Sequence, residues 1–87
     1  MARYKKPLEK MRANPTGWRI SDLDGFVTAF GEKGLKHRRT GSHHHFGFPG
    51  VAEICTVVES RPILPIYIKR FVLFVDKVIV QVEADED

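Results

Sequence analysis

The chain has 87 residues, a hydrophobic content of 43% and a formal net charge of +3. This length excludes more than one domain, and this hydrophobic content is typical of a globular domain rather than of a disordered chain. The single cysteine, Cys55, excludes an intramolecular disulfide and a cysteine-rich zinc site. Its apolar neighbours indicate a packed thiol.

The charge is unevenly distributed along the chain. The last five residues contain four acids, so residues 1–82 contain 14 bases and 7 acids, a net charge of +7. A basic body suits a polyanion such as RNA, although this charge also fits a soluble surface that has no such partner. No secretory signal is visible, and no apolar run approaches the ~20 residues that span a bilayer, so we expect a cytoplasmic protein with no membrane partner.

Charge and turn signals divide the chain into three parts. Residues 1–13 are polar and basic, and we expect a loose N-terminal arm. Residues 14–82 are expected to form a single domain. Residues 83–87 are expected to form a disordered acidic tail.

Two segments predict helices. Apolar residues at helical spacing predict a helix over 22–30, with an N-cap at Ser21 and Gly31 directly after its end. A second apolar stripe predicts a helix from Ile66 to about Val80, with Pro65 at its first position. The β-branched end of this second segment leaves a strand as the alternative.

Three strands are expected between these helices, over residues 35–40, 43–48 and 53–58. Gly41-Ser42 and Pro49-Gly50 predict the turns that join them. The order α-β-β-β-α predicts an α+β fold, a two-layer sandwich of a three-stranded antiparallel sheet with two helices on one face. The other face of the sheet would stay open to solvent.

The stretch from Thr40 to Phe46 holds the best candidates for chemistry. Strand alternation places His43 and His45 on the outward face and His44 on the inward face with two phenylalanines. We expect His44 to be partly buried at the sheet edge. The residues alone leave four interpretations open: an affinity-tag remnant, a metal site with Glu53 as the only nearby helper, a structural or RNA-contacting role, and acid–base catalysis on a phosphodiester.

The acid–base interpretation draws on the basic run before the histidines. Histidine titrates near neutrality, so it can accept a proton from a ribose 2′-hydroxyl or give one to a leaving 5′-oxygen. Nearby cations would stabilise the charge that develops on the phosphorus. The candidate phosphate-binding residues are Lys33, Lys36, Arg38 and Arg39. Such chemistry needs neither a metal nor another cofactor.

Three segments together resemble the HicA toxins, mRNA interferases of bacterial type II toxin–antitoxin systems. They are Gly41-Ser42-His43 on the hairpin, residues 14–23 with the pattern Asn-Pro-x-x-Trp-Arg-Ile-x-Asp-Leu, and residues 61–72 around Arg-Pro-Ile-x-Pro-Ile-Tyr-Ile. In order, they cover about residues 14 to 78.

The resemblance implies a fold like the double-stranded RNA-binding domain, an mRNA endoribonuclease activity and a HicB-type antitoxin that covers the active face as partner in a hetero-oligomer. It implies that His43 is catalytic and that Gly41 allows the tight turn. Ser42 and His45 are possible helpers. The chain departs from the family in having Val57-Val58-Glu59 where many members end the strand in proline, and Leu64 where a lysine is frequent.

Two other functions stay open beside a HicA-type toxin. One is a non-catalytic RNA-binding module on the same fold. The other is a partner-binding domain whose basic face docks an acidic protein.

Overall fold

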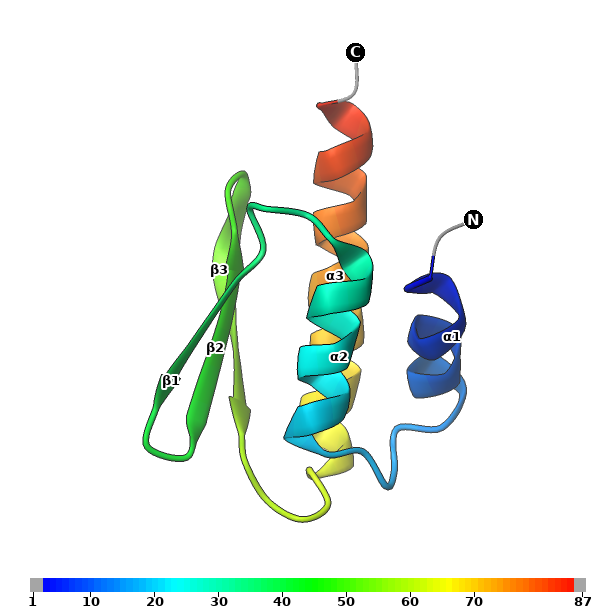
Figure 1. The fold of residues 1–87 in the computed structure, drawn as a ribbon, viewed down its shortest axis with the longest axis vertical. Coiled ribbons are helices and arrows are strands. Elements are labelled where there is room, and N and C mark those ends of the chain that lie inside the picture. Colours follow the sequence, from blue (N-terminus) through cyan, green and yellow to red (C-terminus); the bar gives the residue numbers. More distant parts are fainter. Residues whose placement is uncertain (1–2, 86–87) are drawn as a thin grey trace.

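The computed structural model describes residues 3–85 (Figure 1). Its elements are α1 (Lys5–Ala13), α2 (Ile20–Phe30), β1 (Lys36–Thr40), β2 (His43–Phe48), β3 (Val51–Val58) and α3 (Pro65–Ala84). The strands form one antiparallel sheet in the order β1-β2-β3. The predicted α-β-β-β-α order is therefore confirmed from α2 to α3, with one further helix before it.

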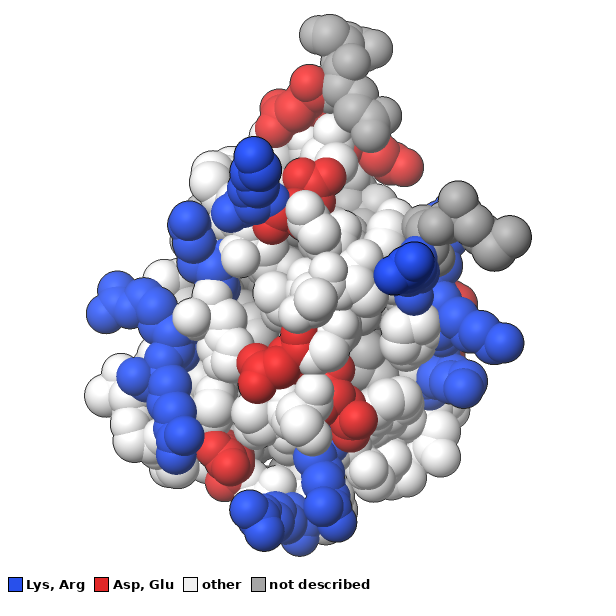
Figure 2. Space-filling view, in the orientation of Figure 1, with Lys and Arg blue, Asp and Glu red and all other residues white. Residues whose placement is uncertain are grey.

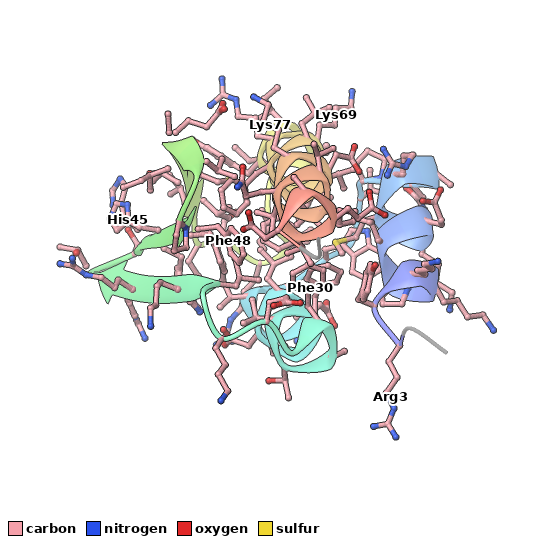
Figure 3. The ribbon with its side chains drawn as sticks, turned by 90° about the horizontal axis from the view of Figure 1, so that it is seen from above. Arg3, Phe30, His45, Phe48, Lys69 and Lys77 are labelled. Atoms are coloured by element: carbon pink, nitrogen blue, oxygen red, sulfur yellow. The ribbon has the colours of Figure 1, made fainter. Side chains whose placement is uncertain are left out.

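Helices α2 and α3 cover one face of the sheet and leave the other face open (Figures 1 and 3). Three fully buried phenylalanines join these two layers. Phe71 of α3 lies edge-on to Phe26 of α2, with ring centroids 5.6 Å apart, and edge-on to Phe46 of β2, at 5.0 Å. Aromatic pairs favour this geometry, so the three rings fix how the helices sit on the central strand.

The N-terminal arm is folded, contrary to expectation. Residues 5–13 form α1, whose Leu8 and Met11 are 3% and 1% exposed. They lie three residues apart, so one face of the helix is apolar and packs against α3 on the side away from the sheet (Figures 1 and 3). Tyr4, just before the helix, contacts Phe30 edge-on, with ring centroids 4.7 Å apart.

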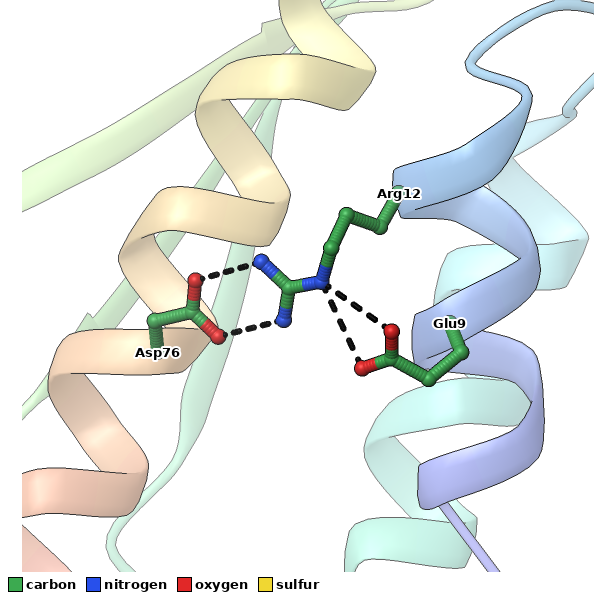
Figure 4. A network of polar contacts seen from close by, with 3 residues as sticks. All are labelled: Glu9, Arg12 and Asp76. Atoms are coloured by element: carbon green, nitrogen blue, oxygen red, sulfur yellow. Dashed lines mark hydrogen bonds and ion pairs between the residues drawn. The ribbon is translucent and has the colours of Figure 1, made fainter.

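A polar contact also ties α1 to α3. The Arg12 guanidinium donates two hydrogen bonds to the Asp76 carboxylate, at 2.9 and 2.8 Å, and its Nε lies 3.3 Å from Glu9 (Figure 4). The hydrogen bond to Asp76 raises the pKa of Arg12. The paired fork adds a directional contact between α1 and α3 to the apolar packing of Leu8 and Met11.

The predicted start of the first core helix was wrong by two residues. Helix α2 begins at Ile20, and the Asp22 carboxylate accepts the backbone N–H of Arg19 at 2.8 Å. Ser21 therefore lies inside the first turn rather than at the cap. The predicted end is confirmed, because Gly31 follows the last helical residue with a left-handed φ of 73°.

Helix α3 starts at Pro65 as predicted but runs to Ala84, beyond the expected end near Val80. The helix was the correct choice over a strand. Ile79 and Val82 still pack against the core, so the apolar stripe supports the extra turn. Glu83 belongs to this helix, which corrects the expected disordered tail. The last two residues of that tail, 86–87, lie outside the described residues.

No helix within residues 3–85 combines the length and the apolar character that crossing a membrane requires.

Replacing Met11 by alanine tests whether α1 is part of the folded domain. We expect Met11→Ala to lower the free energy of unfolding by about 2–4 kcal/mol, because it leaves a cavity at a fully buried position. Lys6→Ala, at an exposed position of the same helix, should change it by less than about 0.5 kcal/mol. Urea denaturation followed by circular dichroism measures both. Equal stabilities for the two variants would mean that the arm is loose.

Candidate active site on the open sheet face

The turn at Gly41-Ser42 places the histidines. It is a two-residue turn in which Gly41 has a left-handed φ of 59°, and Thr40 pairs with His43 across it. Arg39 donates from Nε to the Gly41 carbonyl at 2.7 Å, and the backbone N–H of Glu59 donates to the Ser42 carbonyl at 2.7 Å. Both carbonyls of the turn are thus held by neighbouring residues.

The outward face of β2 carries two histidines, as the alternation predicts. His43 is exposed, and His45 is half-buried. Their rings lie side by side, with centroids 6.4 Å apart and an interplanar angle of 15°. His45 Nδ1 lies 3.0 Å from the Thr56 hydroxyl of β3, which fixes this ring and leaves His43 free to meet a ligand. Figure 3 shows His45 on the side of the sheet away from the helices.

The structure brings only part of the predicted basic set to this face. Arg38 pairs with His45, and Lys36 lies two residues further along β1, opposite Gly47. Lys33 precedes β1, at the end of the sheet away from the turn. Arg39 lies on the other side of β1, where its guanidinium engages the Gly41 carbonyl. The RNA-binding roles of these four residues stay predictions.

A groove of about 480 Å³ opens on the same face, beside His45. Lys36 and Arg38 line one side of it, and the exposed Ile54 lines the other. Figure 2 shows Lys and Arg side chains gathered along the edge of the molecule where the sheet lies, and a second group over α1. The groove therefore combines cations, an imidazole and an apolar wall.

The inward face holds His44, as the alternation predicts, together with polar partners that the sequence did not single out. His44 is 3% exposed and lies in the central strand, not at the sheet edge as expected. Its ring is hydrogen-bonded to His37 of β1 on one side, at 2.8 Å, and lies 2.8 Å from the Glu59 carboxylate on the other. His37 in turn lies 2.7 Å from Asp24 of α2. These four side chains form a polar chain across the inner face.

The charge state of Glu59 follows from this arrangement. The hydrogen bond from His44 lowers the pKa of Glu59, and the charges of Arg39 and Arg61 act in the same direction. Glu59 is therefore a carboxylate at neutral pH. No motif pointed to this residue, since its partner lies 15 positions away in the sequence.

Cys55 is packed, as predicted. Burial raises the pKa of its thiol to about 11, so the nucleophilic thiolate is scarce at neutral pH. Within residues 3–85, no three His, Cys, Asp or Glu side chains are grouped so that they could hold a metal ion.

Comparisons with protein-family models, curated proteins and solved structures find no significant match to this chain.

The lowered pKa of Glu59 predicts a pH-dependent contribution to stability. A carboxylate whose pKa is lower in the folded protein stabilises it above the unfolded value of about 4.5, and this contribution is lost as the pH falls through the folded value. We expect Glu59→Gln to be less stable than the wild-type chain at pH 7 and to approach it in stability as the pH falls below the unfolded value of about 4.5 and through the lower folded value. Denaturation midpoints between pH 3 and pH 7 measure the difference. A constant difference at all pH values would contradict the prediction.

Proposed function

We propose that the chain is a HicA-type toxin, an endoribonuclease that cleaves mRNA by histidine acid–base catalysis without a metal. One observation carries the proposal. His43 is exposed directly after a turn whose two carbonyls are hydrogen-bonded, on the same face as His45 and Arg38. The resemblance in three sequence segments and the helix–three strands–helix order support it.

The chemistry proposed for His43 is a transesterification within the RNA. The imidazole accepts the proton of a ribose 2′-hydroxyl, and that oxygen attacks the adjacent phosphorus. The bond from phosphorus to the 5′-oxygen breaks, and this oxygen takes up a proton as it leaves. The products are a 2′,3′-cyclic phosphate and a 5′-hydroxyl, so the step needs no water and no redox partner. One imidazole can serve both transfers in turn.

The groove beside His45 supplies the binding that this step requires. The Lys36 and Arg38 side chains suit two phosphates of a single strand, and the guanidinium can stabilise the charge that develops on phosphorus. A base can stack on the His45 ring or lie against Ile54. Because most of these contacts are to the sugar–phosphate backbone of the RNA, we expect a weak preference for RNA sequence.

The proposed setting is the cytoplasm, where mRNA is accessible, with a HicB-type antitoxin as the second partner. An antitoxin that covers the open face would both bury His43 and block the groove beside His45. This partner follows from the family resemblance.

The rate at which the His43→Ala variant cleaves RNA tests the catalytic role of His43. We expect this variant to lose about 10²- to 10⁴-fold in cleavage rate, because a positioned acid–base group contributes that much, and to keep its melting temperature because position 43 is exposed. His45→Ala should lose less. The measurement is cleavage of purified mRNA in EDTA, with the products analysed for 2′,3′-cyclic phosphate ends.

Each other result would change the assignment. Full cleavage by His43→Ala would contradict the role of His43. Binding of RNA without cleavage by the wild-type chain would favour the non-catalytic RNA-binding module, and cleavage that EDTA abolishes would indicate a metal-dependent reaction.

The salt dependence of RNA binding tests the groove. Each phosphate contact on a single strand contributes about 0.7 to the slope of log K against log salt concentration. We expect Arg38→Ala to reduce the slope by about this amount, whereas Lys69→Ala should leave it unchanged because Lys69 is an exposed lysine of α3 away from the open face (Figure 3). Fluorescence anisotropy with a short RNA measures both. Equal slopes for both variants would place the RNA elsewhere.

A further inference from the structure

The polar chain on the inner face links α2, β1 and β2 to Glu59, the residue directly after β3, through three short contacts. Asp24 Oδ1 of α2 lies 2.7 Å from His37 Nδ1, His37 Nε2 lies 2.8 Å from His44 Nδ1, and His44 Nε2 lies 2.8 Å from Glu59 Oε1. His37 also stacks on Phe46, with ring centroids 4.4 Å apart. Both rings are therefore held on two sides and cannot turn freely.

Counting hydrogens along these contacts shows what three hydrogen bonds in a row require. The carboxylates of Asp24 and Glu59 only accept, so His37 Nδ1 and His44 Nε2 must carry hydrogens. The two facing nitrogens, His37 Nε2 and His44 Nδ1, form a hydrogen bond only if one of them also carries a hydrogen. Two neutral imidazoles carry one hydrogen each, so three simultaneous hydrogen bonds in this chain require one of the two rings to be an imidazolium. The carboxylates at both ends balance its charge.

This chain of contacts ends at the turn that carries His43. Glu59 accepts from His44 through its side chain and donates to the Ser42 carbonyl through its backbone N–H, at 2.7 Å. Arg39, 3.9 Å from the same carboxylate, donates to the Gly41 carbonyl. Arg61 contributes a further positive charge near Glu59. The backbone of Glu59 and the side chain of Arg39 thus donate to the two carbonyls of the turn, and the Glu59 carboxylate lies between His44 and Arg39.

We infer that His44 is a positioning residue for His43: sharing an imidazolium with His37, it anchors Glu59 and thereby fixes the Gly41-Ser42 turn. The inference rests on the proposed role of His43 in cleavage. His44 touches no substrate, because it faces the helices and is buried, whereas its neighbour His43 faces outward. His44 thus positions the turn, and the adjacent His43 carries out the proposed acid–base chemistry.

Glu59→Gln in the full-length chain is the test variant. The substitution keeps the size of the side chain and removes the negative charge that stabilises the imidazolium. Glu53→Gln is the matched control, because Glu53 is a β3 glutamate paired with a cation, Lys77, at 2.7 Å, and it lies away from the turn. His44→Leu removes the imidazole outright, and the milder Glu59→Gln keeps the test valid if that variant does not fold.

Kinetics distinguishes positioning from a general loss of folded protein. We expect Glu59→Gln to lower kcat for a short RNA by about 10- to 100-fold with KM within about twofold, since a small displacement of a reacting group has this effect. Glu53→Gln should keep the wild-type kcat. A wild-type kcat in Glu59→Gln would overturn the inference.

Nuclear magnetic resonance tests the inference without any RNA. In spectra that correlate hydrogen with nitrogen, we expect the wild-type chain near pH 7 to show three ring hydrogens on His37 and His44 together. We also expect the backbone amide hydrogen of residue 59 to exchange with solvent at least about 10-fold faster in Glu59→Gln than in Glu53→Gln. Two neutral rings, or equal exchange rates, would overturn the inference. If the wild-type chain cleaves no RNA, the proposed function fails, and these spectra alone decide the positioning role.

Discussion

The two-residue turn at Gly41-Ser42 determines the chemistry of both faces of the sheet. In an antiparallel hairpin the turn fixes the pairing, and a shift of one residue would move every side chain of β2 to the other face. His43 would then face the helices, and His44 and Phe46 would face solvent. A left-handed glycine and two hydrogen-bonded carbonyls stabilise the observed pairing. The strand pairing set by this turn therefore determines both the exposure of His43 and the burial of His44.

Features that depend on local sequence could be predicted. Alternation along β1 and β2 separated the outward from the inward histidines, because the period of a strand is fixed by backbone geometry. Gly31 and Pro65 marked a helix end and a helix start, because left-handed φ and a missing N–H suit few other positions. The sheet order followed from short connections between consecutive strands.

Features that depend on distant partners could not be predicted. Leu8 and Met11 alone are a weak signal, and only the surface of α3 shows why residues 5–13 are helical. Asp24 and Glu59 become part of the site only when α2 and the end of β3 meet the hairpin. The contact between His37 and His44 is an intermediate case, since the pairing of a two-residue turn makes them diagonal neighbours on the inner face. Alternation along β1 also puts Arg39 on the side of His37, and its phosphate-binding role stays a prediction.

The position of α1 has a practical consequence for handling the protein. Because α1 packs on the far side of α3, both ends of the described chain lie away from the Gly41-Ser42 turn (Figure 1). A fusion domain or a surface linkage attached at either end would leave the open sheet face pointing outward. The chain can thus be immobilised through a terminus and presented to RNA in solution without covering its histidines.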